Sequence, residues 1–204
     1  MTNLSSQFDR AVDVVFPVDG STLARDHGQA LQAALCAQLP WLGNEALAGI
    51  HAIKLVPGGA DPALLSRRSR LLVRLGAARA AELLALRSLE LDVDGHILQL
   101  GAPHLRELQP HATLYAYKVA ADSGDEMALM DAVNSELSVL AIGGERVCGK
   151  RQHMLVSGRT VTTFSLMLHA LSPEQSLRLQ QHGLGPYRLM GCGIFVAHKS
   201  AAAV

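Results

Sequence analysis

The stretch Thr160-Val-Thr-Thr-Phe-Ser-Leu-Met-Leu-His169, followed by Ala-Leu-Ser172-Pro-Glu-Gln175, decides the fold of the second half of this 204-residue chain. Residues 160–169 are rich in β-branched and apolar side chains, which is typical of a strand. Ser172 and Gln175 form a capping box with proline at the first helical position. Gly183 is the kind of residue that ends a helix. The stretch therefore predicts a strand that runs into a helix over residues 173–182.

The segments around this stretch complete a β-α-β-β-α-β order. Strands are predicted over residues 112–119 and 147–156, and a Ser157-Gly158 turn joins the second of these to residues 160–169. A helix from about residue 126 to 140 lies between them, and residues 194–197 form the last strand. Tyr115 and Tyr117 fall on one face of the first strand, because side chains alternate across a strand.

The first half of the chain repeats this order. Strands are predicted over residues 11–17, 49–56 and 70–75, and residues 89–100 read as a strand, an Asp94-Gly95 turn and a strand. Helices are predicted from Asp26, as the cap, to Leu39 and over residues 77–87. The repeated order is that of the ferredoxin-like fold. The sequence thus predicts an α+β protein of two tandem ferredoxin-like (βαββαβ) domains, residues 1–108 and 109–204.

Composition excludes several classes of protein. Apolar residues make up 49% and charged residues 18%, which excludes a disordered chain. No apolar run approaches the roughly 18 residues that span a bilayer. Three widely spaced cysteines form no CxxC pair, so we expect neither a disulfide framework nor a thiolate zinc site, and a cytoplasmic location. Without an HExxH motif or paired Cys/His spacing, no metal or cofactor is expected.

The net charge of zero hides an asymmetry. Residues 109–142 carry one lysine against five acidic residues, and residues 143–204 carry seven basic residues against two acidic ones. A basic segment of this kind can mark an anion-binding face, although ordinary solvated charge gives the same pattern.

A glycine-rich loop follows the last helix. The sequence Gly183-Leu-Gly185-Pro-Tyr187-Arg188-Leu-Met-Gly191-Cys-Gly193 has the pattern GxGxxxxxGxG. Such glycines let a backbone approach a ligand closely and direct N–H groups at a phosphate. Arg188 adds a cation and Tyr187 a ring that can stack on a base. The alternative is a helix cap followed by a turn.

These features together resemble the CRISPR-associated endoribonucleases that cut repeat RNA into guide RNAs, and most of all their MYXAN-type members. The resemblance covers nearly the whole chain. The matching stretches are Val14–Leu23 with Arg25–Gly28, Leu65–Arg70, Leu166–His169, Ser176–Gln180 and Gly191–Lys199.

The resemblance implies metal-independent cleavage, in which a ribose 2′-OH attacks the adjacent phosphate. It places a general acid or base at His27, between the first strand and the first helix, and imidazole suits either role. The alternative is a helix-terminal histidine with no chemistry; His182 is the second choice. Lys150 is expected to stabilise the charged phosphorane, with Arg25 as its substitute. The expected RNA contacts are Arg25, Arg67, Arg68, Arg70, Arg151, Gly183, Gly185, Tyr187, Arg188, Gly191, Gly193 and Lys199.

Two other functions stay open at this point. One is a non-catalytic subunit that holds guide RNA among the proteins of a CRISPR effector complex. The other is a small-molecule-binding regulatory module, because ferredoxin-like folds host many functions. Aromatic residues make up only 4% of the chain, so a wide base-stacking platform is not expected. The expected partner is repeat RNA, bound by a monomer or a dimer away from any membrane.

Overall fold

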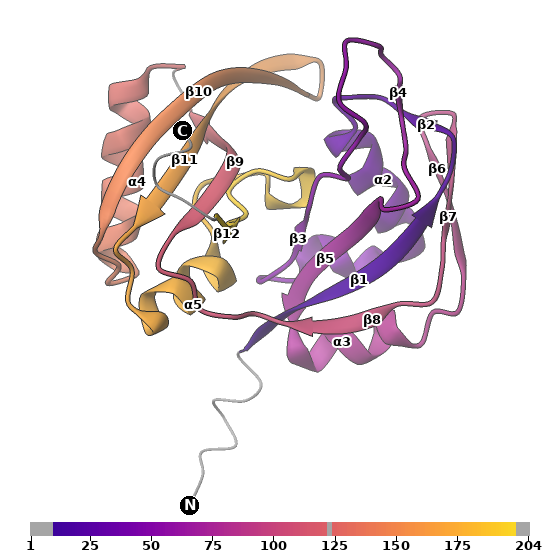
Figure 1. Cartoon of the computed structure of the whole chain (residues 1–204), viewed down its shortest axis with the longest axis horizontal. Helices are drawn as coiled ribbons and strands as arrows, with labels where there is room; N and C mark the ends of the chain where they lie inside the picture. The colour runs from indigo at the N-terminus through magenta and orange to yellow at the C-terminus, as the bar shows by residue number, and fades with distance from the viewer. Residues whose placement is uncertain (1–9, 122–123, 199–204) are drawn as a thin grey trace, which may run out of the picture. The chain divides into compact units, whose positions relative to one another are not determined.

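Figure 1 shows the computed structural model of the chain, which describes residues 10–121 and 124–198. The chain divides into two compact units, Met1–Glu107 and Leu108–Val204. Each unit has the strand order of a ferredoxin-like fold, as the sequence predicts. None of the helices in the described ranges combines the length and the apolar character that crossing a membrane requires.

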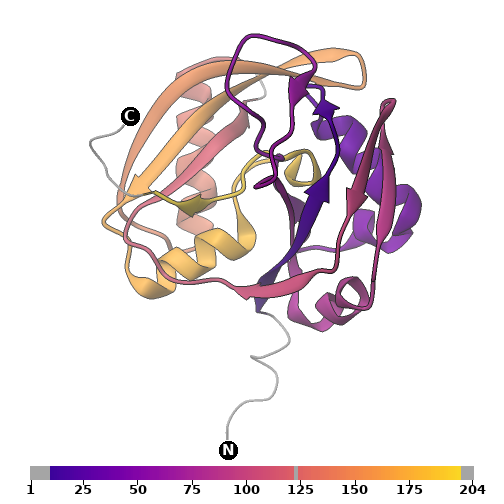
Figure 2. The ribbon, with the colours of Figure 1, turned by 45° about the vertical axis from the view of Figure 1, so that its right-hand side comes forward.

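The first unit is built around β1, whose residues are almost all buried. Its central sheet places β5 on one side of β1 and β8 on the other, with β3 beyond β5, and every neighbouring pair is antiparallel. Figure 2 shows the same elements turned by 45°. The elements are β1 (Ala11–Asp19), α2 (Gly28–Gln38), β3 (Gly49–Ile50), β5 (Arg70–Gly76), α3 (Ala77–Leu84) and β8 (His104–Glu107).

The predicted hairpin over residues 89–100 is present but holds a different place. It forms β6 (Leu89–Val93) and β7 (His96–Leu100), and the turn residues Asp94 and Gly95 both have positive φ, as the Asp-Gly pair predicts. β7 pairs with β6 along its length, but it meets β1 only at the end of that strand, at Val18 and Asp19. The fourth strand of the sheet is β8, which sequence reasoning missed because all four of its side chains are exposed and show no apolar alternation.

Several predicted boundaries in this unit were wrong, and α3 ends at Leu84 instead of residue 87. α2 begins at Gly28 with His27 as its N-cap, so Asp26 does not cap it. The strand expected over residues 49–56 is only β3, because the chain leaves the sheet and the N–H of Ile53 bonds to the His27 ring instead of a strand. Short elements not predicted are η1 (Pro40–Asn44) and the paired β2 (Thr22–Leu23) and β4 (Ala63–Leu64).

A charged cluster lies buried in the middle of the first sheet. Asp13 of β1 accepts hydrogen bonds from Arg74 of β5, at 2.8 and 3.2 Å, and from Arg106 of β8, at 2.6 Å. Nε2 of His51 lies 3.6 Å from the same carboxylate. Burial alone would raise the pKa of Asp13, but His51 and Arg74 hold it far below its ordinary value. Burial lowers the pKa of His51 and keeps this ring neutral at pH 7.

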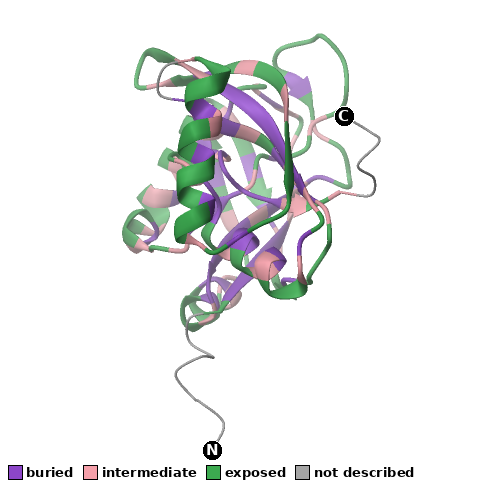
Figure 3. Cartoon of the chain, turned by 90° about the vertical axis from the view of Figure 1, so that its left-hand side faces the viewer, coloured by how far each residue is buried: buried purple, intermediate pink, exposed green. Residues whose placement is uncertain are grey.

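The second unit follows the predicted elements closely. Its sheet has the order β10-β11-β9-β12, and the capping box of Ser172 and Gln175 forms as expected. α4 and α5 pack on one face of this sheet over an apolar core; Figure 3 shows the exposed outer side of α4. The elements are β9 (Leu114–Ala121), α4 (Glu126–Val139), β10 (Glu145–Val156), β11 (Arg159–His169), α5 (Pro173–His182), η2 (Arg188–Met190) and β12 (Val196–Ala197).

Candidate functional site

His27 is held by two backbone groups of its own unit. Its side chain is buried, with 4% exposure for the residue, and Nδ1 lies 2.8 Å from the carbonyl oxygen of Ala24. The backbone N–H of Ile53 donates to Nε2 at 3.0 Å. Because Nε2 accepts, the ring proton lies on Nδ1 and is donated to Ala24. The imidazole thus fastens the start of α2 to the segment that follows β3.

This geometry sets a condition on the predicted catalytic role. With both ring nitrogens engaged, the arrangement is that of a structural histidine. For His27 to exchange a proton with RNA, one nitrogen has to release its backbone partner, and Nε2 would trade the N–H of Ile53 for the reacting oxygen. Catalysis by His27 stays a prediction, and it requires that Nε2 give up the N–H of Ile53 and bind the reacting oxygen.

Arg25 also binds its own chain. Its backbone N–H donates to Oδ1 of Asp61 at 2.9 Å, and its Nε donates to the carbonyl oxygen of Ala60 at 2.8 Å. Together with the β2–β4 pair, these bonds fasten the loop over residues 57–62 to the segment before α2. A contact between Arg25 and RNA would therefore use the donors that remain on its guanidinium.

The three arginines predicted to bind RNA near the start of β5 differ in their exposure and hydrogen bonds. Arg67 and Arg68 are exposed, whereas Arg70 is half-buried and donates from Nη1 to the carbonyl oxygens of Arg67 and Ser69, at 3.1 and 2.7 Å. Arg67 and Arg70 line a shallow depression of about 440 Å³, together with Asp19 and Gln99. Its lining thus places two cations next to one carboxylate, that of Asp19.

The glycine-rich loop, residues 183–193, crosses over itself where its two ends meet. A Cβ atom on Gly193 would lie 1.9 Å from the carbonyl oxygen of Leu184, and one on Gly183 would lie 2.3 Å from that of Gly193. Both glycines have positive φ, +63° and +66°. No other residue fits at this crossing, so the outer glycines of the motif are needed to close the loop.

The N–H groups of the four motif glycines all have acceptors within the unit, which corrects the expectation that they point at a phosphate. Gly185 donates to Oε2 of Glu136 on α4, at 2.9 Å. A carboxylate thus occupies the anion position that the sequence suggested for RNA. The other acceptors are the carbonyl oxygens of Leu179, Arg188 and Lys118, for Gly183, Gly191 and Gly193 respectively.

The other two residues predicted in this loop have different surroundings. Arg188 donates from Nη2 to the carbonyl oxygen of Gln181 at 3.0 Å, at the C-terminal end of α5, where a positive charge is favoured. Tyr187 has left-handed backbone angles, and 38% of its surface is exposed. Arg188 therefore holds the loop to the helix, and Tyr187 is the member that solvent and a ligand can reach.

Two β-bulges lie opposite one residue in the middle of the second sheet. Gly149 and Lys150 of β10 both lie opposite Ser165 of β11, and Tyr117 and Lys118 of β9 lie opposite the same serine. The Ser165 hydroxyl accepts the backbone N–H of Lys150 at 2.8 Å. Bulges re-aim side chains, and these two give β9 and β10 an extra residue each.

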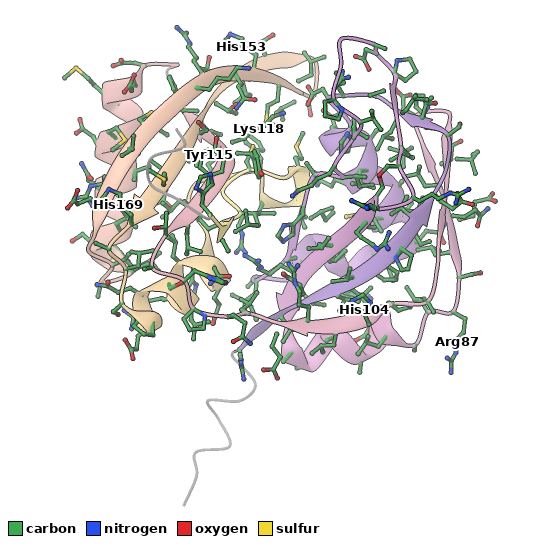
Figure 4. The ribbon with its side chains drawn as sticks, in the orientation of Figure 1. Arg87, His104, Tyr115, Lys118, His153 and His169 are labelled. Carbon is green, nitrogen blue, oxygen red and sulfur yellow. The ribbon has the colours of Figure 1, made fainter. Side chains whose placement is uncertain are left out.

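The bulges direct two lysines to the face of the sheet opposite α4 and α5, which we call the open face. The glycine-rich loop covers one part of this face, where Met190 and Cys192 pack against Met154 of β10. Tyr117 and Lys118 lie between Ala116 and Val119, which both pack in the helix-side core, so the bulged pair faces the other way. Figure 4 labels Lys118 and Tyr115 on β9. Lys150 lies on the same open face, opposite Ser165. Sequence reasoning missed Lys118 because it stands in the acidic segment.

Lys150, the predicted cation, and Arg151, a predicted RNA contact, lie on opposite faces of β10. Arg151 pairs with Phe164, whose side chain belongs to the helix-side core, and its guanidinium lies close to Gly124, just before α4. An RNA on the open face would therefore meet Lys150 and not Arg151.

The acidic side chains of the second unit lie mostly in the helical layer. Glu145 opens β10 and forms an ion pair with His169, 3.4 Å away. The other acidic residues in the described part of this unit lie on or next to the helices, and they are Asp125, Glu126, Asp131, Glu136 and Glu174. Most acidic side chains of this unit therefore lie in a different layer from Lys118 and Lys150. The net charge of zero conceals this separation between the helical layer and the open face of the sheet.

The remaining candidates add little chemistry. Burial lowers the pKa of His182, and Arg188 and Arg178 lower it further, so this ring is neutral at pH 7. Within residues 10–121 and 124–198, no group of three or more His, Cys, Asp and Glu side chains could hold a metal ion. Lys199, predicted to contact RNA, lies outside the described residues.

Comparisons with known proteins agree with the predicted family. The profile of the family described as Cas6 Crispr matches residues 12–200. The chain is 36% identical over 194 residues to a CRISPR-associated endonuclease Cas6 of Myxococcus xanthus (strain DK1622), covering 95% of this chain and 84% of that protein.

Solved structures show the same fold at low sequence identity. A CRISPR-associated protein Cas6 has a TM-score of 0.67 at 8% identity, covering 93% of this chain and all of that one. Thermus thermophilus Cse3, bound to an RNA representing a pre-cleavage complex, has a TM-score of 0.53 at 13% identity, covering 92% and 98%.

Proposed function

The chain belongs to the Cas6 family of CRISPR-associated proteins, and from that premise we propose that it is an endoribonuclease that cleaves CRISPR repeat RNA into guide RNAs. The observation that carries the RNA partner is the open face of the second sheet. Two bulges bring Lys118 and Lys150 there, while the acidic residues lie in the helical layer. Cations on such a face neutralise phosphates and give most of the affinity of a protein for a nucleic acid backbone.

The proposed reaction needs no group beyond the protein and the RNA. The ribose 2′-oxygen forms a bond to the adjacent phosphorus, and the bond from that phosphorus to the 5′-oxygen breaks. The 2′-OH loses its proton to a base, and the departing 5′-oxygen gains one from an acid. The products are a 2′,3′-cyclic phosphate and a 5′-hydroxyl. In-line positioning and stabilisation of the charged phosphorane supply the rest of the rate.

His27 is the proposed acid or base, acting through Nε2 once that atom has exchanged the N–H of Ile53 for the RNA oxygen. Its Nδ1–H remains bonded to Ala24 and keeps the ring oriented. Lys150 is proposed to bind phosphate, and its assignment as the phosphorane-stabilising cation stays a prediction.

The absence of disulfide bonds among Cys36, Cys148 and Cys192 fits the proposed location in the cytoplasm.

A second candidate function is favoured by one observation. Both nitrogens of His27 are engaged within the first unit, as in a structural histidine, which suits a subunit that binds guide RNA without cutting it. Such a subunit would remain with other proteins of an effector complex. The small-molecule module predicts an apolar pocket; the depression at Arg67 and Arg70 is shallow, and its lining combines apolar residues such as Val18 and Leu100 with charged ones.

Labelled repeat RNA separates these functions. The purified protein is mixed with the repeat RNA and with a shuffled RNA of the same composition, and both binding and cleavage are followed. The proposed function predicts cleavage at one position in the repeat and none in the shuffled RNA. Binding without cleavage supports the guide-holding subunit, and no preference for the repeat contradicts both.

A further inference from the structure

Three aromatic rings form a contiguous row at the edge of the open face. The rings of Tyr115 and Tyr117 meet edge to face, with their centroids 4.9 Å apart and their planes at 89°. The imidazole of His198 lies 5.3 Å from the Tyr115 ring. Tyr117 ends this row and is 56% exposed, whereas Tyr115 and His198 are half-buried. A tyrosine supported by a second ring and open to solvent is an unusual feature on a chain with few aromatic residues.

The bulge in β9 fixes the backbone beneath Tyr117. Nε2 of Gln152 crosses from β10 and donates to the carbonyl oxygen of Tyr117 at 2.8 Å. The next carbonyl, that of Lys118, accepts the N–H of Gly193 at 2.7 Å. The glycine-rich loop and β10 therefore both hold the bulge in place, and the Tyr117 ring projects from a rigid base.

Cations lie next to the ring. Lys118 follows Tyr117 in the same bulge, and Lys150 belongs to the bulge on the far side of Ser165. Proteins bind unpaired nucleotides with aromatic rings beside a row of cations. The bases stack on the rings, and the phosphates between them contact the cations. In a duplex the base faces are covered by neighbouring pairs, so an exposed ring selects single strands.

We propose that the stacking surface, formed by Tyr115, Tyr117 and His198 with Lys118 and Lys150, binds an unpaired nucleotide of single-stranded RNA. The base stacks on the exposed face of Tyr117, and the flanking phosphates lie toward the two lysines. This inference rests on the proposed function, since it assigns a place to the unpaired part of the repeat RNA. It adds Tyr117 to Tyr187, whose stacking on a base stays a prediction.

The test compares Tyr117→Ala and Tyr117→Phe with the unchanged protein. Each is titrated into a single-stranded oligonucleotide from the repeat, with 2-aminopurine at successive positions, and into a blunt RNA duplex of equal length. Stacking predicts that Tyr117→Ala weakens single-strand binding by about fivefold to a hundredfold and that Tyr117→Phe keeps it. Quenching of 2-aminopurine at one position is expected to disappear in Tyr117→Ala alone.

Leu155→Ala supplies the matched control. Leu155 is also 56% exposed, but its neighbour Met154 packs against the glycine-rich loop on the open face, so Leu155 lies on the helix side of β10. Its removal is expected to leave RNA binding unchanged. Equal single-strand affinity of Tyr117→Ala and the unchanged protein would overturn the stacking surface while leaving the proposed function intact. Failure of the unchanged protein to bind or cleave the repeat would instead overturn the proposed function.

Discussion

The backbone N–H of Ile53 donates a hydrogen bond to Nε2 of His27 at 3.0 Å. The histidine that the resemblance implies as the general acid or base therefore also stabilises the folded structure. Removing the ring takes this partner from the N–H of the buried Ile53 and from the carbonyl of the half-buried Ala24. We expect His27→Ala to lower the free energy of unfolding by about 2–4 kcal/mol. Urea unfolding measures this loss. A stability within about 0.5 kcal/mol of the unchanged protein would contradict the structural role.

The buried cluster around Asp13 predicts a loss of stability in acid. The folded-state pKa values of His51 and Asp13 both lie below their ordinary values of 6.5 and 3.8, so the unfolded chain takes up more protons. Their contributions are complete above pH 6.5. That of His51 decreases as the pH falls below 6.5, and that of Asp13 decreases below 3.8. Urea unfolding between pH 8 and 5 is expected to show a weaker pH dependence in His51→Gln than in exposed His104→Gln.

Much of the fold follows from local sequence signals, and the exceptions have physical causes. The capping box at Ser172 and the Asp94-Gly95 turn depend on neighbouring residues alone, and both form as predicted. β8 could not be predicted, because its exposed side chains show no pattern and only its pairing with β1 makes it a strand. The early end of β3 depends on His27, which is distant in sequence.

The candidate site was harder to predict than the fold. The glycine pattern was found, but its reason is the crossing of Gly183, Leu184 and Gly193, which only the folded loop reveals. Lys118 was missed because the charged residues that next follow it in sequence are acidic. The bulge instead places it opposite Ser165, on the same face of the sheet as Lys150. The count of charges by sequence segment therefore left Lys118 out of the predicted basic surface.

Closure of the glycine-rich loop predicts a large difference between two glycine substitutions. Gly193 and Gly158 both have positive φ, but a Cβ on Gly193 would lie 1.9 Å from a carbonyl oxygen, whereas one on Gly158 meets no atom within 4 Å. We expect Gly158→Ala to cost about 1 kcal/mol, which is the strain of the left-handed backbone. Gly193→Ala is expected to cost several times more and to abolish RNA binding. Similar unfolding energies for the two variants would show that the loop does not need the crossing.

The contact between Glu136 and the loop predicts a gain of RNA affinity on neutralisation. In Glu136→Gln the amide oxygen still accepts the N–H of Gly185, but the negative charge that opposes a phosphate is gone. Because the side chain is exposed, we expect a rise of about twofold to fivefold at low salt. Asp131→Asn removes the same charge from the same helix and serves as control. An equal rise in both variants would mean that the loop itself is no RNA contact.

The chemistry at the scissile phosphate tests the central claim most directly. Repeat RNA is incubated in EDTA with the unchanged protein and with His27→Gln, whose amide can still hold one of the two backbone groups. Product ends are analysed alongside unfolding and RNA binding. We predict a 2′,3′-cyclic phosphate and a 5′-hydroxyl from the unchanged protein, and no cleavage by a folded, RNA-binding His27→Gln. Tight binding of the repeat by the unchanged protein without cleavage would contradict the account.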